Sequence, residues 1–304
     1  MRTALISDIH GNDFALSAVL KDAAAAGVER YLFLGDFCSD VPMPNEVSDR
    51  LFSLGNAAFV RGNKEDYLAG IHEGERSWNG KQWCALRWNY EALGKDYLSR
   101  YLKMPKQISV PLDSGTLYAT HSAYDFFGRT AADRIRTGQF CEWMRLAPFT
   151  HEEFLSRVQR DLEAEDHALR PGDVYVFGHT HLQWYANVRG ALLVNPGSCG
   201  LALDMDGRAA YTILDDPGNG TLPAVIERRV EYPVDRAMTA ILRSPSYGED
   251  SRIWYSIILL ELKSAADHVH KFVKELNKAA PPPYPDDVWT EVGERFLLTT
   301  ASPA

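Results

Sequence analysis

The sequence lacks the features that mark membrane-spanning, secreted and disulfide-stapled proteins. No uninterrupted apolar run in its 304 residues is long enough to span a bilayer. The chain reaches Asp8 too early for the apolar core of a signal peptide to precede it. Its 4 cysteines are scattered, so they predict neither a Cys-x-x-Cys zinc pair nor a disulfide framework. We therefore expect a cytoplasmic protein in a reducing compartment, with no membrane partner.

Positive charge is also scarce. A formal net charge of -9 and an isoelectric point near 5.5 leave no basic stripe that could follow a nucleic-acid backbone. Long nucleic acid is therefore not an expected partner, whereas a small nucleotide is not excluded. With 45% apolar residues the chain can bury a large core, so most of it should be ordered.

Five short polar fragments each follow an apolar run that predicts a β-strand. The expected strands cover residues 3–7, 31–34, 57–60, 116–120 and 174–177. Helices expected at 13–26 and about 46–54 alternate with the first three strands, which favours an α/β fold with ligands at the carboxyl ends of the strands. The fragments are Asp8-Ile9-His10, Gly35-Asp36, Gly62-Asn63-Lys64-Glu65, His121 and Gly178-His179-Thr180-His181.

The side chains in these fragments are suited to binding metals. Aspartate, asparagine and histidine can together hold two divalent cations side by side, with one carboxylate bridging them. Such a pair activates water and clamps phosphoryl oxygens during displacement at phosphorus. The residues therefore predict a two-metal phosphoesterase that needs no protein nucleophile.

Two helical insertions interrupt the expected α/β pattern. Residues 67–104 interleave aromatic residues with charges at helical spacing, and we favour a packing face there over direct substrate contact. A second insertion covers 124–171, with a helix expected at 152–169. Between and after them, hairpins are expected at 107–120 and 184–194, and strands at 209–214 and 224–230.

The carboxyl-terminal part changes character after the last expected strand. We predict a main domain over residues 1–231 and a helical extension over 232–280 that packs on it, with helical segments at 234–242 and 251–279. A proline run then begins at Pro281, so the tail 281–304 is expected to be extended.

In their order and placement the fragments resemble the calcineurin-like metallophosphoesterase family, and most closely its small bacterial phosphodiesterases. Asp8-Ile9-His10-Gly11-Asn12 and Asn195-Pro196-Gly197-Ser198 match motifs of that branch as they stand. The likeness covers about residues 1–230. It implies an α/β fold in the form of a two-sheet α/β/β/α sandwich, here with helical insertions and a C-terminal helical extension.

The resemblance also implies how the ligands divide between two cations. The first cation would be held by Asp8, His10 and His181. The second would be held by Asn63, His121 and His179. Asp36 would bridge the two, and a hydroxide shared by the cations would attack a phosphodiester, with phosphomonoesters as further substrates. Manganese is the first expectation for both ions, and iron, zinc, nickel and cobalt are alternatives, because mixed Asp, Asn and His ligands accept all of them.

Three residues are expected to be catalytic, namely Asp36, Asn63 and Lys64. Lys64 departs from the relatives, many of which have histidine there and others cysteine. Two adjacent cations would lower the pKa of Lys64, so it could protonate the leaving group. It could equally bind a phosphate oxygen or pair with Glu65 at the surface. Asn12 is either close to the phosphate or the N-cap of the first helix.

Two other functions fit the same fragments. One is a non-catalytic scaffold, because the retromer subunit that resembles this branch shows that the fold can serve assembly. The other is a protein phosphatase. A scaffold would be free to lose Asp36 or the histidines, and all of them are present here. The helical additions could cap the metal site, or they could form an oligomer interface through the apolar segment 253–260.

Overall fold

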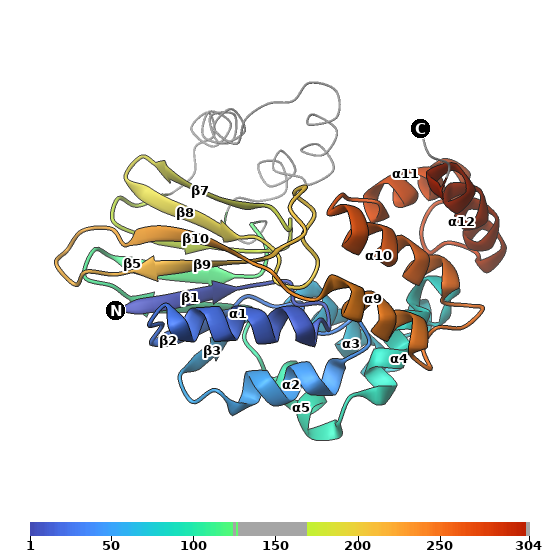
Figure 1. Ribbon diagram of the computed structural model, residues 1–304, viewed down its shortest axis with the longest axis horizontal. Helices are drawn as coiled ribbons and strands as arrows, with labels where there is room; N and C mark the ends of the chain where they lie inside the picture. The colour runs from blue at the N-terminus through green and yellow to red at the C-terminus, as the bar shows by residue number, and fades with distance from the viewer. Residues whose placement is uncertain (124–125, 127–168, 302–304) are drawn as a thin grey trace.

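The computed structural model describes residues 1–123, 126 and 169–301 of the chain, and it contains two five-stranded sheets flanked by helices (Figure 1). This is the α/β sandwich that the sequence predicts. The second predicted insertion, including the helix expected at 152–169, lies almost entirely outside the described residues. Within the described part, no helix is both long and apolar enough to cross a membrane.

The first sheet has the strand order β10-β9-β1-β2-β3. Its strands are β1 (Arg2–Ile6), β2 (Arg30–Phe33), β3 (Ala57–Phe59), β9 (Ala209–Asp215) and β10 (Ala224–Val230). β1, β2 and β3 are parallel, and β9 and β10 complete the sheet in antiparallel pairing. The parallel strands therefore deliver their carboxyl ends to one edge.

The second sheet has the order β4-β5-β6-β8-β7. Its strands are β4 (Gln107–Pro111), β5 (Thr116–Thr120), β6 (Val174–Val176), β7 (Gln183–Val188) and β8 (Ala191–Pro196). The pairs β4–β5 and β7–β8 are the two predicted hairpins, whereas β5, β6 and β8 run parallel. β5 and β6 thus end side by side.

The side chains of β1 alternate between the two faces of the first sheet, which explains why the sheets and helices form layers. Ala4 and Ile6 are fully buried in a cluster with α1 (Asp13–Ala25) and α2 (Pro44–Ser53), whereas Leu5 is buried among residues of the second sheet. Successive side chains of a strand point to opposite faces, so one strand serves both cores. The apolar layer between the sheets fixes their mutual position.

The insertion at 67–104 is helical, as predicted. It begins within α3 (Asn63–His72) and continues through the 3-10 turns η1 (Arg76–Asn79) and η2 (Lys81–Trp83), α4 (Cys84–Ala92) and α5 (Lys95–Leu102). Most of its aromatic side chains pack against the core that α1 and α2 also join, as a packing face requires, and two of them, Tyr67 and Trp83, also line a cavity. The packed aromatic residues include Tyr67, Trp78, Trp83, Tyr90 and Tyr97.

The C-terminal extension consists of α9 (Val234–Arg243), α10 (Arg252–Ser264), α11 (Val269–Ala279) and α12 (Asp286–Ala301). In Figure 1 these helices lie at the side toward which β1 runs. The single helical segment predicted at 251–279 is wrong in one respect, because it divides into α10 and α11. Ala265 ends α10 in the left-handed conformation, and the buried Glu261 accepts the backbone N–H groups of His268 and Val269 where α11 begins.

The extended tail predicted for 281–304 is also wrong over most of its length. The proline run breaks the chain only between α11 and α12. Asp286 and Asp287 then supply negative charge to the first turn of α12, which favours its helix dipole. The helix is held in place by burying Trp289, Val292 and Phe296 against α10 and α11. The proline run led to the prediction of an extended tail, so the apolar face of α12 was not recognised in the sequence.

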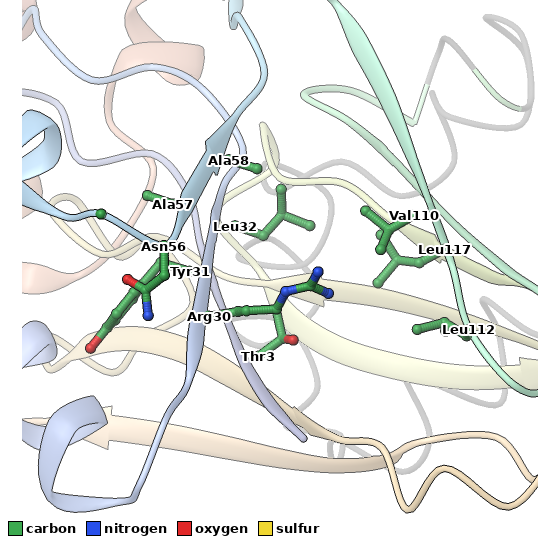
Figure 2. Close-up of a pocket in the computed structure, with 11 residues that line it drawn as sticks. Thr3, Arg30, Tyr31, Leu32, Asn56, Ala57, Ala58, Val110, Leu112 and Leu117 are labelled. Carbon is green, nitrogen blue, oxygen red and sulfur yellow. The ribbon is translucent and has the colours of Figure 1, made fainter.

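A cavity of about 300 Å³ opens between the sheets at the amino ends of β1, β2 and β3 (Figure 2). Thr3, Arg30 and Leu32 line it from the first sheet, and Val110 and Leu117 line it from the second. The predicted metal ligands follow the carboxyl ends of β1 and β2, so this cavity is remote from them.

Replacing Leu276 tests whether the C-terminal helices share the stability of the domain. Leu276 on α11 is 0% exposed, so Leu276→Ala should lower the free energy of unfolding by about 2–5 kcal/mol. Leu242→Ala on α9 is the matched control, since Leu242 is 52% exposed and its loss should cost less than about 0.5 kcal/mol. Urea unfolding followed by circular dichroism measures both, and equal effects would contradict the packing described.

Candidate metal centre

The five polar fragments converge where the parallel strands end. Asp8 and His10 follow β1, Asp36 follows β2, and Asn63 opens α3 after β3. His121 follows β5, and the pair His179 and His181 follows β6. Five of these side chains are buried: Asp8, His10, Asp36, His121 and His181. The structure therefore brings all seven predicted ligands to one edge of the sandwich.

The first group of donor atoms comes from Asp8, His10 and His181. Nε2 of His10 lies 3.1 Å from Nε2 of His181. Oδ1 of Asp8 is 3.8 Å from the former and 3.4 Å from the latter. That oxygen is buried and has no hydrogen-bond partner in the described chain. A buried, unsatisfied carboxylate oxygen facing two imidazole nitrogens is a donor set that fits a transition-metal cation.

The second group gathers around His121. Its Nε2 lies 3.0 Å from Oδ1 of Asn63 and 3.2 Å from Nδ1 of His179. Oδ1 of Asp36 is 3.5 Å from the same nitrogen, while Oδ2 of Asp36 is 3.8 Å from Nε2 of His10. Asp36 thus presents one oxygen to each group, the placement expected of a bridging ligand.

The backbone at the centre is strained. Eight non-glycine residues in the described chain have positive φ, and five of them are predicted ligands: Asp8, His10, Asp36, His179 and His181. Such conformations cost about 1–3 kcal/mol each and persist only where the surroundings impose them. Backbone hydrogen bonds from Asp8 to Gly35 (3.1 Å) and from His10 to Asp36 (2.9 Å) help to impose them here. Strain concentrated on ligands is the mark of a functional site.

Two glycines in the fragments are required by close approach. A Cβ at Gly178 would lie 2.5 Å from Oδ2 of Asp8, and a Cβ at Gly62 would overlap Oδ1 of Asp36. Both contacts are far shorter than real Cβ atoms allow. The glycines therefore let β6 and α3 approach the ligands on β1 and β2.

Three of the histidines are oriented through the ring nitrogen that faces away from the centre. Nδ1 of His10 lies 2.6 Å from Oδ2 of Asp40. Nδ1 of His121 lies 2.6 Å from the carbonyl of Leu34, and Nδ1 of His181 lies 2.5 Å from that of Leu201. In each case Nδ1 donates its proton outward, so Nε2 is the nitrogen that faces the centre and that would bind a cation after losing its own proton.

Carboxylates of the centre raise the pKa of two of its histidines, His10 and His121, although burial opposes both shifts. Burial opposes the charged form of His10, but hydrogen bonds to Asp40 and Asp8 outweigh it and raise the pKa of His10 to about 10. Burial and the neighbouring His121 lower the pKa of His179 to about 4, so this imidazole is neutral. The carboxylates therefore hold cationic partners in a buried place, as a metal centre requires.

Asp40 is a site residue that the sequence did not reveal. Besides Nδ1 of His10, its carboxylate accepts hydrogen bonds from Ser39 Oγ (2.7 Å) and from Nε1 of Trp254 (2.9 Å) on α10. Its pKa is held well below the ordinary value because Lys64 and His10 outweigh the cost of burial. Asp40 follows no predicted strand, so only the folded chain shows that it supports a ligand.

The predicted surface pairing of Lys64 with Glu65 is wrong, because Glu65 is buried. Its carboxylate accepts the backbone N–H groups of Asp36 (2.9 Å), Phe37 (2.8 Å) and Gly62 (2.8 Å). Burial and the charge of Asp36 raise the pKa of Glu65 to about 7. Glu65 thus fixes the loop that presents Asp36.

Lys64 faces the interior of the site. Its Nζ lies 3.9 Å from Oδ2 of Asp40, and 5.9 Å and 5.7 Å from the ring centroids of Tyr67 and Trp254. Burial lowers the pKa of Lys64, but Asp40 and Asp36 outweigh it and the net shift is upward. The lowered pKa expected beside two cations stays a prediction.

Asn12 is the N-cap of α1. Its Oδ1 accepts the backbone N–H of Ala15 (3.1 Å), and its Nδ2 donates to the carbonyl of Gly200 (2.8 Å). Of the two roles predicted for Asn12, the structure therefore supports capping. Ser198 likewise has a structural role, since its hydroxyl donates to the carbonyl of Asp8.

A cavity of about 310 Å³ lies over the ligands. His10, Asp36 and His179 line one side, and α10 and α11 close the other with residues that include Trp254 and Glu261. The C-terminal helices therefore cover the candidate metal centre.

Comparison with known proteins also indicates a phosphoesterase fold. The profile of the calcineurin-like phosphoesterase superfamily domain matches residues 1–216. An uncharacterized protein of Methanocaldococcus jannaschii is 25% identical over 256 residues, which cover 79% of this chain and 92% of that protein.

Two solved structures share the fold. A metallophosphoesterase from Sphaerobacter thermophilus superposes with a TM-score of 0.57 at 22% identity, covering 88% of this chain and 99% of its own. A hypothetical protein from Pyrococcus horikoshii superposes with a TM-score of 0.59 at 17% identity, covering 84% of this chain and 97% of its own. Both matches support the two-sheet architecture.

Removing the charge of Asp40 should weaken metal binding without removing a ligand. Asp40→Asn loses the carboxylate that orients His10, so metal affinity should fall about 10–100-fold. Manganese titration of dialysed protein measures this, and Asp235→Asn, at an exposed aspartate of α9, is the control. Unchanged affinity in a folded Asp40→Asn protein would show that Asp40 does not support the centre.

Glu261 should make stability depend on pH. Burial and the neighbouring Asp267 raise its pKa from 4.5 to about 8, and the charges of Asp40 and Lys64 also act on this part of the cavity. Because the folded protein binds the proton of Glu261 more tightly than the unfolded chain does, the protonated carboxyl adds to the free energy of unfolding. This contribution is complete below pH 4.5, the ordinary pKa, and is lost as the pH rises to about 8, the pKa in the folded protein.

Glu261→Gln removes this titration. The free energy of unfolding of the original protein, measured by urea relative to Glu261→Gln, should therefore decline between pH 4.5 and about 8. A difference that stays constant over this interval would contradict the shift.

Proposed function

Because this chain belongs to the calcineurin-like phosphoesterase superfamily, we propose that it is a metal-dependent hydrolase of phosphodiesters. The observation that carries the proposal is the pair of largely buried donor groups that share Asp36. Asp8, His10 and His181 would hold one divalent ion, and Asn63, His121 and His179 the other. When bound, the ions would supply an activated water as nucleophile and positive charge for the phosphoryl oxygens. Manganese is our first choice.

The protein's own groups would bind and orient the phosphate. The ammonium of Lys64 lines the cavity beside Asp36 and Asn63, so it can bind a phosphoryl oxygen as negative charge builds there. The carboxylates of Asp40 and Asp36 favour the charged form of Lys64, which is the form that binds a phosphoryl oxygen. The carboxylate of Asp40 holds the imidazole of His10 in place.

Two features favour a small phosphodiester. The carboxylates of Asp40 and Asp267 line the cavity, and a diester brings one negative charge near them where a monoester brings up to about two. A volume of about 310 Å³ under α10 and α11 suits a small phosphoester or nucleotide better than a protein-bound phosphoserine. We propose that the enzyme works in the cytoplasm.

A scaffold remains the alternative from another class. It would require no ligands, yet this chain has a suitable residue at all seven positions and holds five of them in strained backbone. Strain of this kind costs stability and gives no benefit to a surface that only binds a partner. An oligomer formed through the helical additions is compatible with either function.

Asp36→Asn tests the enzyme directly. The amide keeps the shape of the side chain but loses the charge shared by both donor groups, so hydrolysis of bis(p-nitrophenyl) phosphate should fall at least about 100-fold, or about 2.7 kcal/mol. Release of p-nitrophenolate by manganese-loaded protein measures the rate, and elemental analysis counts the bound ions.

Asp235→Asn serves as the control and should retain the activity. If the unaltered protein takes up no metal and turns over none of a panel of phosphodiesters and monoesters, the scaffold is favoured instead.

A further inference from the structure

A second cavity of about 320 Å³ adjoins the cavity over the metal centre. The two share Asp40, Asn63, Lys64, Trp254, Val269 and Val273. Beyond this common wall the lining turns aromatic, with Tyr67, Trp83, Tyr284 and Trp289. We call the second cavity, with these four side chains and Trp254, the aromatic pocket.

The aromatic pocket is built by the two helical additions together. Tyr67 of α3 and Trp83 of η2 form one wall, with ring centroids 5.5 Å apart. Trp254 of α10 and Trp289 of α12 form the other, with centroids 6.4 Å apart and an angle of 27° between the ring planes. The walls are joined where the backbone N–H of Lys81 donates to Asp286 (2.8 Å). Because packed rings hold each other, the pocket is formed before any ligand enters.

Charge is confined to the wall that the two cavities share. Lys64 and Asp40 lie there. The described lining residues beyond that wall carry no charge at neutral pH. Gln82 is the amide in this uncharged part. A group that enters the pocket leaves water for aromatic and aliphatic surface, which favours an apolar and planar occupant.

Aromatic walls also attract quaternary ammonium groups, so a cationic ligand is the main alternative to a neutral ring in this pocket. The ammonium of Lys64 already lies over the rings of Tyr67 and Trp254, at 5.9 Å and 5.7 Å from their centroids. A second cation beside it would be repelled. The charge of Lys64 suits a phosphate at the metal centre and a neutral ring beyond it.

We propose that the aromatic pocket binds a planar aromatic group, either an aryl ring or a nucleobase, of a phosphodiester whose phosphorus lies at the metal centre. This inference rests on the proposed phosphodiesterase function and names its substrate class. The volume of about 320 Å³ is at the lower end for a ligand site, so it suits one ring system. The insertion at 67–104 and the C-terminal helices would then set specificity.

Two substitutions alter the aromatic pocket without touching the metal-centre cavity. Tyr284→Ala removes one aromatic side chain of the lining, and Gln82→Trp fills the space with an indole. Both residues line only the second of the two cavities and are partly exposed. Tyr185→Ala is the matched control, because Tyr185 is 40% exposed on β7.

Binding is measured first, by calorimetry on manganese-loaded protein. Phenylphosphonate should bind about 10-fold tighter than methylphosphonate, the factor that about 1.4 kcal/mol of stacking supplies. Comparing the affinities of adenosine 5′-phosphate and ribose 5-phosphate, which differ by the adenine base, shows whether the pocket also accepts a nucleobase. Both altered proteins should lose the aromatic preference and keep the affinity for methylphosphonate, whereas Tyr185→Ala should keep the preference.

Inhibition is measured second, on the hydrolysis of bis(p-nitrophenyl) phosphate by manganese-loaded protein. The inhibition constant of phenylphosphonate should be about 10-fold lower than that of methylphosphonate, and this difference should vanish in Tyr284→Ala and Gln82→Trp.

The outcomes separate this inference from the proposed function. Hydrolysis of bis(p-nitrophenyl) phosphate with equal inhibition constants for the two phosphonates would overturn the aromatic assignment and leave the phosphodiesterase standing. Tighter binding of choline phosphate than of phenylphosphonate would do the same. Preferential binding of phenylphosphonate without hydrolysis of bis(p-nitrophenyl) phosphate would support the pocket and overturn the enzymatic function.

Discussion

The position of the Asp36 carboxylate is the constraint on which the rest of the site depends. One oxygen faces His121 and the other faces His10, so the two donor groups can act as one centre only while Asp36 is held between them. The backbone N–H of Lys64 donates to Oδ1 of Asp36 (2.8 Å), and Glu65 binds the backbone of Asp36 itself. These bonds explain why Asn63, Lys64 and Glu65 start a helix directly beside β2.

The same constraint accounts for the strained backbone. Side chains from two sheets must converge on Asp36 from strand ends, and left-handed residues turn the chain sharply enough to aim them inward. Gly178 and Gly62 leave room for that approach. The stability lost at these residues is recovered in the apolar layer between the sheets, where Leu5 and Val194 are fully buried.

Much of this arrangement could be predicted from the sequence. Short apolar runs ending in Asp or His identified β1, β2, β5 and β6, because period-two burial and strand-end ligands are local patterns. Asp40 and Trp254 escaped prediction because their roles depend on contacts between distant segments. The helix α12 was hidden by the neighbouring prolines, and its apolar face has meaning only against α10 and α11. The aromatic pocket likewise exists only after the two helical additions meet.

The central claim is that Asp36 joins two cations at this edge of the sandwich. A crystal structure of the manganese-loaded protein, with anomalous scattering recorded at the manganese edge, measures this most directly. The account predicts two anomalous peaks, one beside Asp8, His10 and His181 and one beside Asn63, His121 and His179, with an oxygen of Asp36 coordinating each. A single peak, or two peaks that Asp36 does not contact, would contradict it.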